Sequence, residues 1–323
     1  MMTTSVAMCT YNGESFLRKQ IDSILNQTIP VNEIIICDDR STDETHNILS
    51  DYQKNNPDIF KIYINEKNLK SVKNFEKAIS LCSGDIIFLS DQDDIWEENK
   101  VEVFTNYFQN MPKITAICSD GIAIDNSGKV IDQRTIWSVP KLLKANDIDV
   151  DYFNIIAFIE NIATGAGMAF RKSIVEKILP IPTKDGFHHD EWIALLTSYE
   201  KSFIMIDEKL FRYRIHDNQQ VGGVLYKNDD ATAKRLVNHF NLFSDEKTFL
   251  QYKKFLKRLS QSYNKHKTLS VENDGKNIYI SKEIMARCLQ LFKHHQKIMR
   301  SKYPLKFFIL GIADLFNNKR KIK

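Results

Sequence analysis

Short apolar runs alternate with amphipathic segments over the first hundred residues of the chain. In the segments between the runs, apolar side chains recur every three or four residues, which is the spacing of one helix face. The expected strands are 5–9, 33–37, 60–64 and 86–90, and a helix is expected after each of them. This alternation is typical of an α/β protein with a doubly wound, mostly parallel sheet.

Polar residues follow each of these expected strands. In open parallel sheets, ligands bind beyond the carboxyl ends of the strands. None of the four ends carries a G-x-G-x-x-G pattern or a Walker loop, which argues against a dinucleotide oxidoreductase and an ordinary ATPase. Acidic groups that read a base or ribose, together with a metal that neutralises phosphates, could still hold a nucleotide. The polar strand ends are 10–12, 38–39, Asn68 and 91–94.

The most acidic of these strand ends is Asp91-Gln92-Asp93-Asp94. Two carboxylates separated by one residue can hold a hard divalent cation that keeps several waters and completes its shell with phosphate oxygens. Two other interpretations stay open at this point. Asp residues after strands often serve only as turn residues. A phosphatase-like Asp-x-Asp nucleophile pair is the other, although that site usually follows the first strand and this one follows later strands.

The second half of the chain is patterned less regularly. A run of four turn-forming residues at 125–128 predicts a hairpin, and glycines inside an apolar run predict a bulge or a close backbone approach. The expected elements are a strand at 114–118, a hairpin at 121–131, a helix at 152–159, a strand with two glycines at 161–171 and a strand at 203–206.

Several ordered motifs in the first hundred residues resemble the nucleotide-binding half of inverting family 2 glycosyltransferases. That family has the GT-A fold, a Rossmann-like α/β architecture. The Asp-Gln-Asp-Asp variant resembles bacterial transferases of cell-surface polysaccharide synthesis, including rhamnosyltransferase-like members. The resemblance covers about two thirds of the chain and fades after Tyr226. The matching pieces are 10–13, Gln27, 33–43, Asn68, Asn74, Ala78, 84–85 and 90–96.

The resemblance implies roles for individual residues near the nucleotide and the metal. Asp91 and Asp93 form the D-x-D pair that binds Mn²⁺ or Mg²⁺, with Asp94 as an adjacent supporter. His216 completes the metal shell or donates to the phosphates, or is simply structural. The residues expected to border the nucleotide-sugar are Thr10, Tyr11, Asn12, Glu14, Asp38, Asp39, Asn68, Asp91 and Gln92.

A second cluster of chemical groups opens the expected helix at 192–199. Direct displacement at an anomeric carbon needs a base on the acceptor hydroxyl and a Lewis acid on the leaving diphosphate. The family places an acidic pair here, and Asp190 matches its catalytic member, with Glu191 as the alternative base. His189 stands where relatives often carry Glu. The other interpretation is that both acids only cap the helix.

Charge divides the chain at about residue 226. From 226 to 323 there are 22 Lys and Arg against 8 Asp and Glu, which leaves 23 against 33 in the preceding part. The expected domains are 1–225, with a nucleotide-binding half at 1–100 and an acceptor half at 101–225, and a basic helical region at 226–323. The apolar stretch at 303–316 has basic flanks, so it either lies in a membrane interface or docks on the protein.

Composition places the chain among ordinary globular proteins, with 43% hydrophobic and 27% charged residues. No apolar run approaches the ~18 residues of a membrane-spanning helix, and no signal peptide is visible. The five cysteines lack metal spacing and are expected to be reduced. We therefore expect a cytoplasmic protein with no nucleic-acid partner, with peripheral contact to the inner face of the membrane through its basic C-terminal region.

Together these features predict a metal-dependent inverting glycosyltransferase. The expected donor is a nucleoside-diphosphate sugar, either dTDP-rhamnose or a UDP-hexose, and the expected acceptor is a saccharide or lipid-linked saccharide of bacterial surface polysaccharide synthesis. The alternative is a catalytically inactive nucleotide-sugar-binding module. A sugar-nucleotide pyrophosphorylase would instead need a glycine-rich basic loop after the first strand, and residues 10–13 do not form one.

Overall fold

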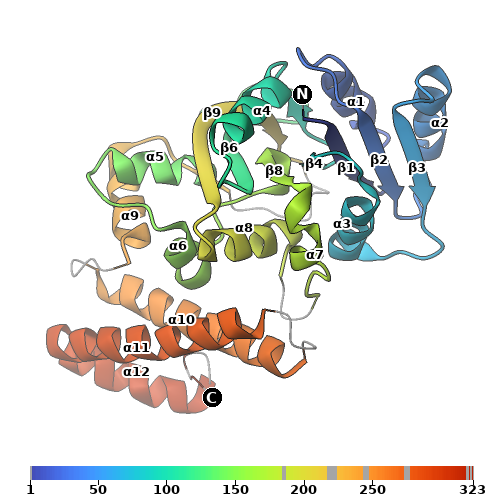
Figure 1. Cartoon of the computed structure of the whole chain (residues 1–323). Coiled ribbons are helices and arrows are strands. Elements are labelled where there is room, and N and C mark those ends of the chain that lie inside the picture. Colours follow the sequence, from blue (N-terminus) through green and yellow to red (C-terminus); the bar gives the residue numbers. More distant parts are fainter. Residues whose placement is uncertain are drawn as a thin grey trace. The chain divides into compact units, whose positions relative to one another are not determined.

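The computed structural model describes residues 2–183, 187–216, 224–242, 247–272, 277–317, 320 and 322 (Figure 1). Its contacts group the chain into two compact units. The first comprises Met1–Pro140, Ala163–Thr183 and Phe187–Asn228, and the second comprises Lys141–Ile162 and Asp229–Lys323. Residues 141–162, which the sequence analysis assigned to the first domain, thus group with the C-terminal helices. The division expected at residue 225 remains a prediction.

A mixed sheet with the strand order β3-β2-β1-β4-β8-β6-β9-β5 forms the centre of the first unit. The first four strands pair in parallel, as the alternation predicts, and β8 joins β4 antiparallel. The strands are β1 (Thr4–Thr10), β2 (Glu33–Asp38), β3 (Phe60–Ile64), β4 (Ile86–Ser90), β5 (Ile95–Trp96), β6 (Ala116–Ile124), β8 (Met168–Arg171) and β9 (Phe203–Arg214).

Helices connect the parallel strands in the first unit, and a separate two-stranded ladder pairs β7 (Arg134–Thr135) with β10 (Leu225–Tyr226). The helices are α1 (Leu17–Leu25), α2 (Thr45–Asn55), α3 (Lys70–Leu81), α4 (Lys100–Asn110), α7 (Val175–Ile178) and α8 (His189–Tyr199), with 3₁₀ turns at Ile136–Ser138, Gly165–Gly167 and Lys172–Ile174. Short α5 (Val139–Lys144) follows the first of these turns. The predicted α/β architecture is confirmed.

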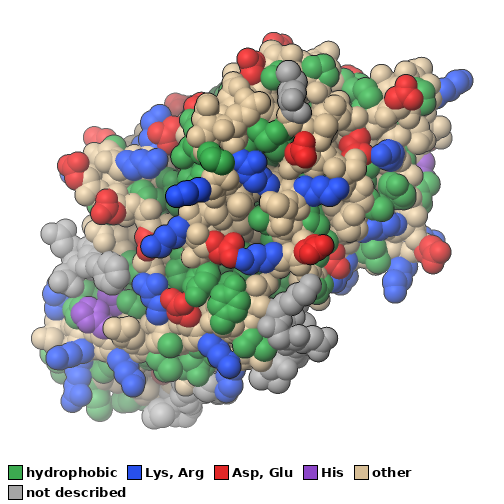
Figure 2. Space-filling view, in the orientation of Figure 1, with side chains coloured by type: hydrophobic (Ala, Val, Ile, Leu, Met, Phe, Trp, Pro, Cys, Tyr) green, Lys and Arg blue, Asp and Glu red, His purple; other side chains and the backbone are tan. Residues whose placement is uncertain are grey.

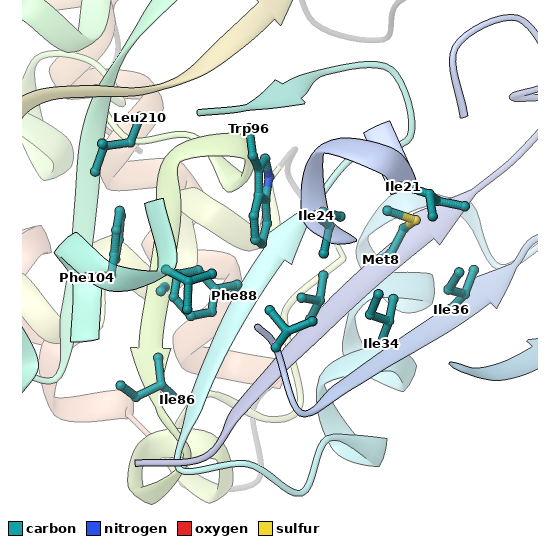
Figure 3. Close-up of a cluster of buried hydrophobic side chains, with 14 of the residues drawn as sticks. Met8, Ile21, Ile24, Ile34, Ile36, Ile86, Phe88, Trp96, Phe104 and Leu210 are labelled. Carbon is teal, nitrogen blue, oxygen red and sulfur yellow. The ribbon is translucent and has the colours of Figure 1, made fainter. Parts of the chain in front are cut away.

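Alternate side chains of β1, β2 and β4 form one buried apolar cluster with residues of α1 and α4 on one face of the sheet (Figure 3). Burying apolar surface is worth roughly 25 cal/mol per Å², so this packing holds the strands firmly in register. The register pairs Thr10 with Asp38 and Asp38 with Ile64. The polar strand ends therefore lie side by side at one edge of the sheet.

Two expected strands in the second half of the chain extend further than predicted. The strand expected at 114–118 continues to Ile124, and the one expected at 203–206 continues to Arg214. Register shifts around Asp120 let the long pair continue, and a Cβ on Gly121 would lie 2.5 Å from the Phe211 ring. Asp120 and Gly121 therefore belong to a bulged ladder, although their residue types also suit a turn.

The remaining expectations for this part were partly right. The expected strand at 161–171 begins only at Met168, because Gly165–Gly167 form a 3₁₀ turn. The turn at 125–128 is confirmed by a Gly128 N–H that donates to Asp125 O (2.9 Å), but the hairpin's second strand is reduced to one bridge, Ile124 to Val130. Strand β5 was not predicted. All five cysteines are free thiols.

The second unit is helical in its described part. It contains α6 (Tyr152–Phe158), α9 (Asp230–Phe240), α10 (Phe249–Glu272), α11 (Ile278–Lys302) and α12 (Pro304–Asn317). The helices α10 and α11 pack along each other, and Ser262 Oγ donates to Ala157 O (2.7 Å), which ties α10 to α6. Within the described ranges, every helix is too short or too polar to cross a membrane.

Candidate active site

The loop after β1 is clamped to the loop after β4 by the side chain of Gln92. The Tyr11 N–H donates to Gln92 Oε1 (2.8 Å), and Gln92 Nε2 donates to Tyr11 O (3.0 Å). A Cβ at position 13 would lie 2.4 Å from Gln92 Oε1, so a larger residue there would displace the Gln92 side chain from this clamp. The middle residue of the D-x-D motif thus joins two strand ends, in addition to any contact it makes with a ligand.

Side chains of the first loop also hold the loop after β2. Asn12 has a left-handed backbone (φ 49°), which Asn tolerates better than most residues, and its Oδ1 accepts from Thr42 N–H (2.8 Å). Glu14 Oε2 accepts from the Glu44 N–H (2.9 Å). Both residues therefore have structural partners, and their expected contacts with a nucleotide stay predictions.

Asp38, at the end of β2, is fully buried and fully engaged by its own chain. Its Oδ2 accepts from the hydroxyls of Thr10 (2.7 Å) and Ser41 (2.6 Å). Its Oδ1 accepts from Ser41 N–H (2.9 Å) and lies 2.7 Å from His46 Nε2. Each carboxylate oxygen has two partners, so no acceptor position is left for a ligand. The sequence analysis missed His46.

Asp39 is also buried, but its carboxylate has more room. Its Oδ1 accepts from Asn65 Nδ2 (2.8 Å) and Leu69 N–H (2.7 Å), and its Oδ2 accepts from Lys70 N–H (2.8 Å). One lone pair of Oδ2 is therefore open. Asn68 belongs to the same turn, where its Oδ1 accepts from Lys70 N–H (3.1 Å). Of the two adjacent acids, Asp39 is the one that could still contact a base or ribose.

The acidic loop after β4 contains carboxylates with fewer partners. Asp93 Oδ2 lies 2.8 Å from His216 Nε2, so these two residues are in contact, and their expected roles at a metal stay predictions. Asp94 is buried, and its Oδ1 accepts from the Arg214 N–H (3.0 Å), whereas its Oδ2 has no hydrogen-bond partner among the described residues. Burial raises the pKa of Asp91 to about 7, and the negative charges of Asp93 and Asp190 add to the effect.

Two buried cations stand beside this loop, and the sequence analysis did not identify one of them, Lys100, as a site residue. Arg214 donates through Nε to Asp93 O (2.9 Å) and through a terminal nitrogen to Asp125 O (3.0 Å). Lys100 is fully buried, with its Nζ 4.0 Å from the centre of the Trp96 ring. Burial lowers the Lys100 pKa to about 7, although Asp94 and Asp91 act in the opposite direction.

Asp190 lies in the first turn of α8, where two backbone N–H groups hold its carboxylate. Gly165 N–H donates to Oδ2 (3.2 Å) and Glu191 N–H donates to Oδ1 (2.6 Å). Burial raises the pKa of Asp190 to about 6, although these bonds favour the ionised form. Glu191 is more deeply buried than Asp190. A carboxylate with a pKa near neutrality that keeps some exposure suits a general base.

Gly165 lies between the acidic loop and the start of α8. A Cβ at this position would lie 3.7 Å from Asp91 Oδ2 and 2.7 Å from His189 Nε2. The His189 ring is stacked on Phe75 with ring centres 3.8 Å apart, so it cannot easily move aside. Asp91 and Asp190 therefore both approach Gly165, and the charge of Asp190 acts on the pKa of Asp91.

His189 itself is an unusual member of this site. It is 6% exposed, and neither ring nitrogen has a hydrogen-bond partner in the part of the chain that the structure describes. Burial lowers its pKa to about 3, so the ring is neutral at physiological pH. Relatives often carry a negatively charged Glu at this position. The neutral His189 ring supplies no such charge.

The donor set fits a hard divalent cation only in part. Asp91, Asp93 and Asp94 offer carboxylate oxygens, which Mg²⁺ and Mn²⁺ prefer, and Asp94 Oδ2 is a buried oxygen that no group in the described part of the chain contacts by a hydrogen bond. Among the described residues, no three His, Cys, Asp or Glu side chains are arranged as a ready metal cage. This suits a cation bound through one or two carboxylates, with phosphate oxygens and water completing its shell.

Comparison with known proteins decides the family. The model of glycosyl transferase family 2 matches residues 5–179, which is more than half of the chain. The chain belongs to glycosyl transferase family 2. It is therefore a nucleotide-sugar-dependent glycosyltransferase, and the expected family and enzyme class are confirmed. An uncharacterised glycosyltransferase from Nostoc is 25% identical over 96% of this chain and 89% of its own length.

One further relative matches a shorter part of the chain, and two solved structures align over nearly all of it. The dTDP-rhamnosyl transferase RfbG of Shigella flexneri is 39% identical over 29% of this chain and 34% of its own length. The structure of Staphylococcus aureus TarS 1–349 with UDP-GlcNAc aligns over 98% of this chain and 90% of its own, with a TM-score of 0.56 and 14% identity. The mannosyltransferase PcManGT of Pyrobaculum calidifontis, with GDP-Man and Mn²⁺, aligns over 97% and 80%, with a TM-score of 0.50 and 14% identity. These structures confirm the GT-A fold.

Proposed function

We propose that this glycosyltransferase inverts the anomeric carbon of its donor, with Asp190 as the base. The observation that carries the proposal is the meeting of Asp91 and Asp190 at Gly165. Two carboxylates from distant parts of the chain share a site there, and the pKa of each is raised towards neutrality, mainly by burial. Groups with such shifted pKa values in a shared site are typical of catalysis.

The residues around the acidic loop divide the work in this proposal. Asp91 and Asp93 hold Mn²⁺ or Mg²⁺, with Asp94 and His216 in support, and Asp39 contacts the base or ribose. The bound cation supplies Lewis-acid stabilisation of the leaving diphosphate. Asp190 accepts the proton of the attacking hydroxyl, while the N–H groups of Gly165 and Glu191 hold its carboxylate in place.

The proposed donor is dTDP-rhamnose, with a UDP-hexose second. The segment shared with the Shigella dTDP-rhamnosyl transferase supports the first, and the fold shared with TarS bound to UDP-GlcNAc is compatible with the second. The proposed acceptor is a saccharide, free or lipid-linked, in bacterial surface polysaccharide synthesis. We place the enzyme in the cytoplasm, at the inner face of the membrane.

Release of nucleoside diphosphate tests this proposal directly. The purified protein is incubated with dTDP-rhamnose, UDP-glucose or UDP-GlcNAc, with and without Mn²⁺, Mg²⁺ or a chelator, and free dTDP and UDP are quantified. We expect release from one donor that requires the cation and increases when saccharide acceptors are added. Donor binding without release under every condition would instead identify a catalytically inactive nucleotide-sugar-binding module.

A further inference from the structure

The helix α12 exposes a continuous apolar stripe, which we call the α12 apolar face. Its members recur at positions i, i+3, i+4 and i+7, which places them on one side of a helix. They are Leu305 (79% exposed), Phe308 (69%), Ile309 (65%) and Ile312 (46%). Leu310, which falls off this stripe, is buried instead, and α12 contacts α11. The helix is thus packed on its neighbour while its more apolar side stays uncovered.

Four large apolar side chains in one exposed stripe indicate a binding surface. Single exposed apolar residues are ordinary, but contiguous patches on a protein surface usually mark an interaction site. The helix has 14 residues and is about 21 Å long, which is shorter than the ~30 Å hydrocarbon core of a bilayer. A helix of this kind can lie in the plane of a membrane surface but cannot cross it.

Positive charge surrounds the α12 apolar face. Between residues 293 and 314 the chain has five Lys and Arg against one acid, Asp314, which is paired with Arg320. The basic side chains of this stretch are exposed, and Figure 2 shows Lys and Arg gathered over the C-terminal helices. Apolar residues flanked by basic ones match a surface that is apolar within and anionic at its rim.

We propose that the α12 apolar face binds the surface of an anionic lipid bilayer. Phe308 and Ile312 enter the boundary between headgroups and acyl chains, while Lys302 and Lys306 remain among the phosphates. The basic flanks favour this partner over an apolar protein groove, where lysines would lose their hydration without gaining an anion. The proposal concerns the second unit alone and does not depend on the chemistry of the site.

Vesicle sedimentation with the full-length chain tests this proposal. We expect at least tenfold stronger binding to phosphatidylcholine vesicles containing 30% phosphatidylglycerol than to pure phosphatidylcholine, and weaker binding at high salt. Phe308→Glu with Ile312→Glu should lose at least tenfold in vesicle binding, whereas Lys302→Gln with Lys306→Gln should lose only the preference for anionic lipid. The matched control is Val130→Glu, at an exposed apolar residue outside the C-terminal helices, which should bind as the wild type does.

Two results would overturn it. The first is equal binding of the wild type and the Phe308→Glu/Ile312→Glu variant to the anionic vesicles. The other is a dimer that sediments as such in analytical ultracentrifugation and dissociates in the Phe308→Glu/Ile312→Glu variant, which would assign the face to a second copy of the chain. The four substituted side chains (Lys302, Lys306, Phe308 and Ile312) are exposed. Both double variants should therefore keep the thermal unfolding temperature of the wild type.

A second, independent inference concerns Lys100 and rests on the proposed function. Its Nζ donates to Ala166 O (2.5 Å), and the preceding residue, Gly165, donates its N–H to Asp190. The same Nζ lies 4.0 Å from the centre of the ring of Trp96, which follows the acidic loop on β5. Because burying an ammonium group is costly, a purely packing role would be better served by an apolar residue.

We infer that Lys100 is a positioning residue that keeps the Gly165–Gly167 turn, and through it Asp190, at a set distance from the acidic loop. It bonds to the backbone of that turn, and its own location is set by the rings of Trp96 and Phe211. The substitution Lys100→Met keeps a side chain of similar length between these rings, and it removes the hydrogen-bond donor to Ala166 O and the positive charge. It therefore separates positioning from packing.

Steady-state kinetics of Lys100→Met, with the donor on which the wild type turns over, tests this inference. We expect kcat to fall at least 30-fold while the donor KM changes less than threefold. The control is Val101→Ala, a fully buried neighbour on α4, which should lower the unfolding temperature without lowering kcat. A Lys100→Met enzyme that keeps its kcat, or that only matches Val101→Ala, would overturn the inference. A wild type without turnover would instead overturn the proposed function.

Discussion

The carboxylates at the end of β2 and those around β4 and α8 lie in the same unit but are held very differently. Asp38 has two partners for each oxygen, all from its own chain. Asp94 has one buried oxygen without a hydrogen-bond partner in the part of the chain that the structure describes, and the Asp91 and Asp190 carboxyl groups have pKa values raised mainly by burial. The first arrangement is complete without a ligand, whereas the second becomes more favourable when a cation or a proton arrives.

The difference distinguishes carboxylates that stabilise the fold from carboxylates that are available for chemistry, although both kinds follow strands of the same sheet or lie close to them. A buried carboxylate that accepts several hydrogen bonds stabilises the fold, and its removal should be felt in the free energy of unfolding. A buried carboxylate with few partners destabilises the fold when it is ionised, and such groups are retained where function requires them. Substitutions in the two regions should therefore move different measurements.

The largest effect is expected for Asp190→Asn. The amide cannot accept the proton of the attacking hydroxyl, so kcat should fall by roughly 10³-fold, within the range of general-base catalysis. Donor affinity, measured by calorimetry in the presence of Mn²⁺, should change less than about threefold. Asp207→Asn, an exposed acid on β9, is the matched control. If Asp190→Asn lost donor binding instead, Asp190 would belong to the donor site and not act as the base.

Asp38→Asn should have the next largest effect, on stability. The NH₂ group of the new Asn side chain would replace a carboxylate oxygen that accepts hydrogen bonds, and it would point its own hydrogens at the groups that donate to Asp38. The free energy of unfolding in urea should therefore fall by about 2–4 kcal/mol. The exposed Asp58 offers a control on the loop before β3, and Asp58→Asn should change stability by less than about 0.5 kcal/mol. Unchanged stability together with lost donor affinity would place Asp38 among the ligand contacts.

Asp93→Ala should weaken donor binding only when a divalent cation is present. Loss of one carboxylate from the proposed cation site should raise the donor Kd about tenfold in Mn²⁺, which corresponds to ~1.4 kcal/mol. With a chelator, the donor Kd of the variant should equal that of the wild type. Equal affinities in Mn²⁺ would remove Asp93 from the metal site and leave it as the partner of His216.

The smallest effect is a pH-dependent gain in stability for Asp190→Asn. Because the folded pKa of Asp190 is about 6 and the unfolded value is ~3.9, the folded wild type binds more protons between these values and loses stability as pH rises through them. The variant lacks this loss. A shift of about 2 pKa units corresponds to at most ~3 kcal/mol, and solvent screening of the partly exposed Asp190 reduces this figure. The free energy of unfolding of the variant in urea should therefore gain about 1 kcal/mol on that of the wild type between pH 4 and pH 8. A constant difference across this range would refute the shifted pKa.

Much of the fold follows from local pattern. The first four strands and the helices between them were predicted because a buried parallel strand and an amphipathic helix each leave a periodic signal within a short stretch. Strand β9 was predicted only in part, because its central residues Asp207, Glu208 and Lys209 are exposed and interrupt the apolar pattern. Strand β5 has two residues, which is too short for any periodicity.

The site was predicted less completely than the fold. The motifs identified Asp91, Asp93 and Asp190 as candidates, and the structure brings Asp91 and Asp190 together at Gly165. The motifs did not show that Asp38 is saturated, since two of its partners, Thr10 and His46, come from different elements. Lys100 resembles an ordinary helix-surface lysine in sequence, and it becomes a site residue only because Ala166 and two aromatic rings surround it.

The residue types and their order were sufficient to establish the α/β class, the family resemblance and the acids that could do chemistry, since each of these is encoded in short, contiguous segments. Which acids are satisfied and which are left open was settled only when the chain folded. Hydrogen bonds, burial and electric field depend on groups that are tens of residues apart in sequence, and local periodicity carries no record of those distances.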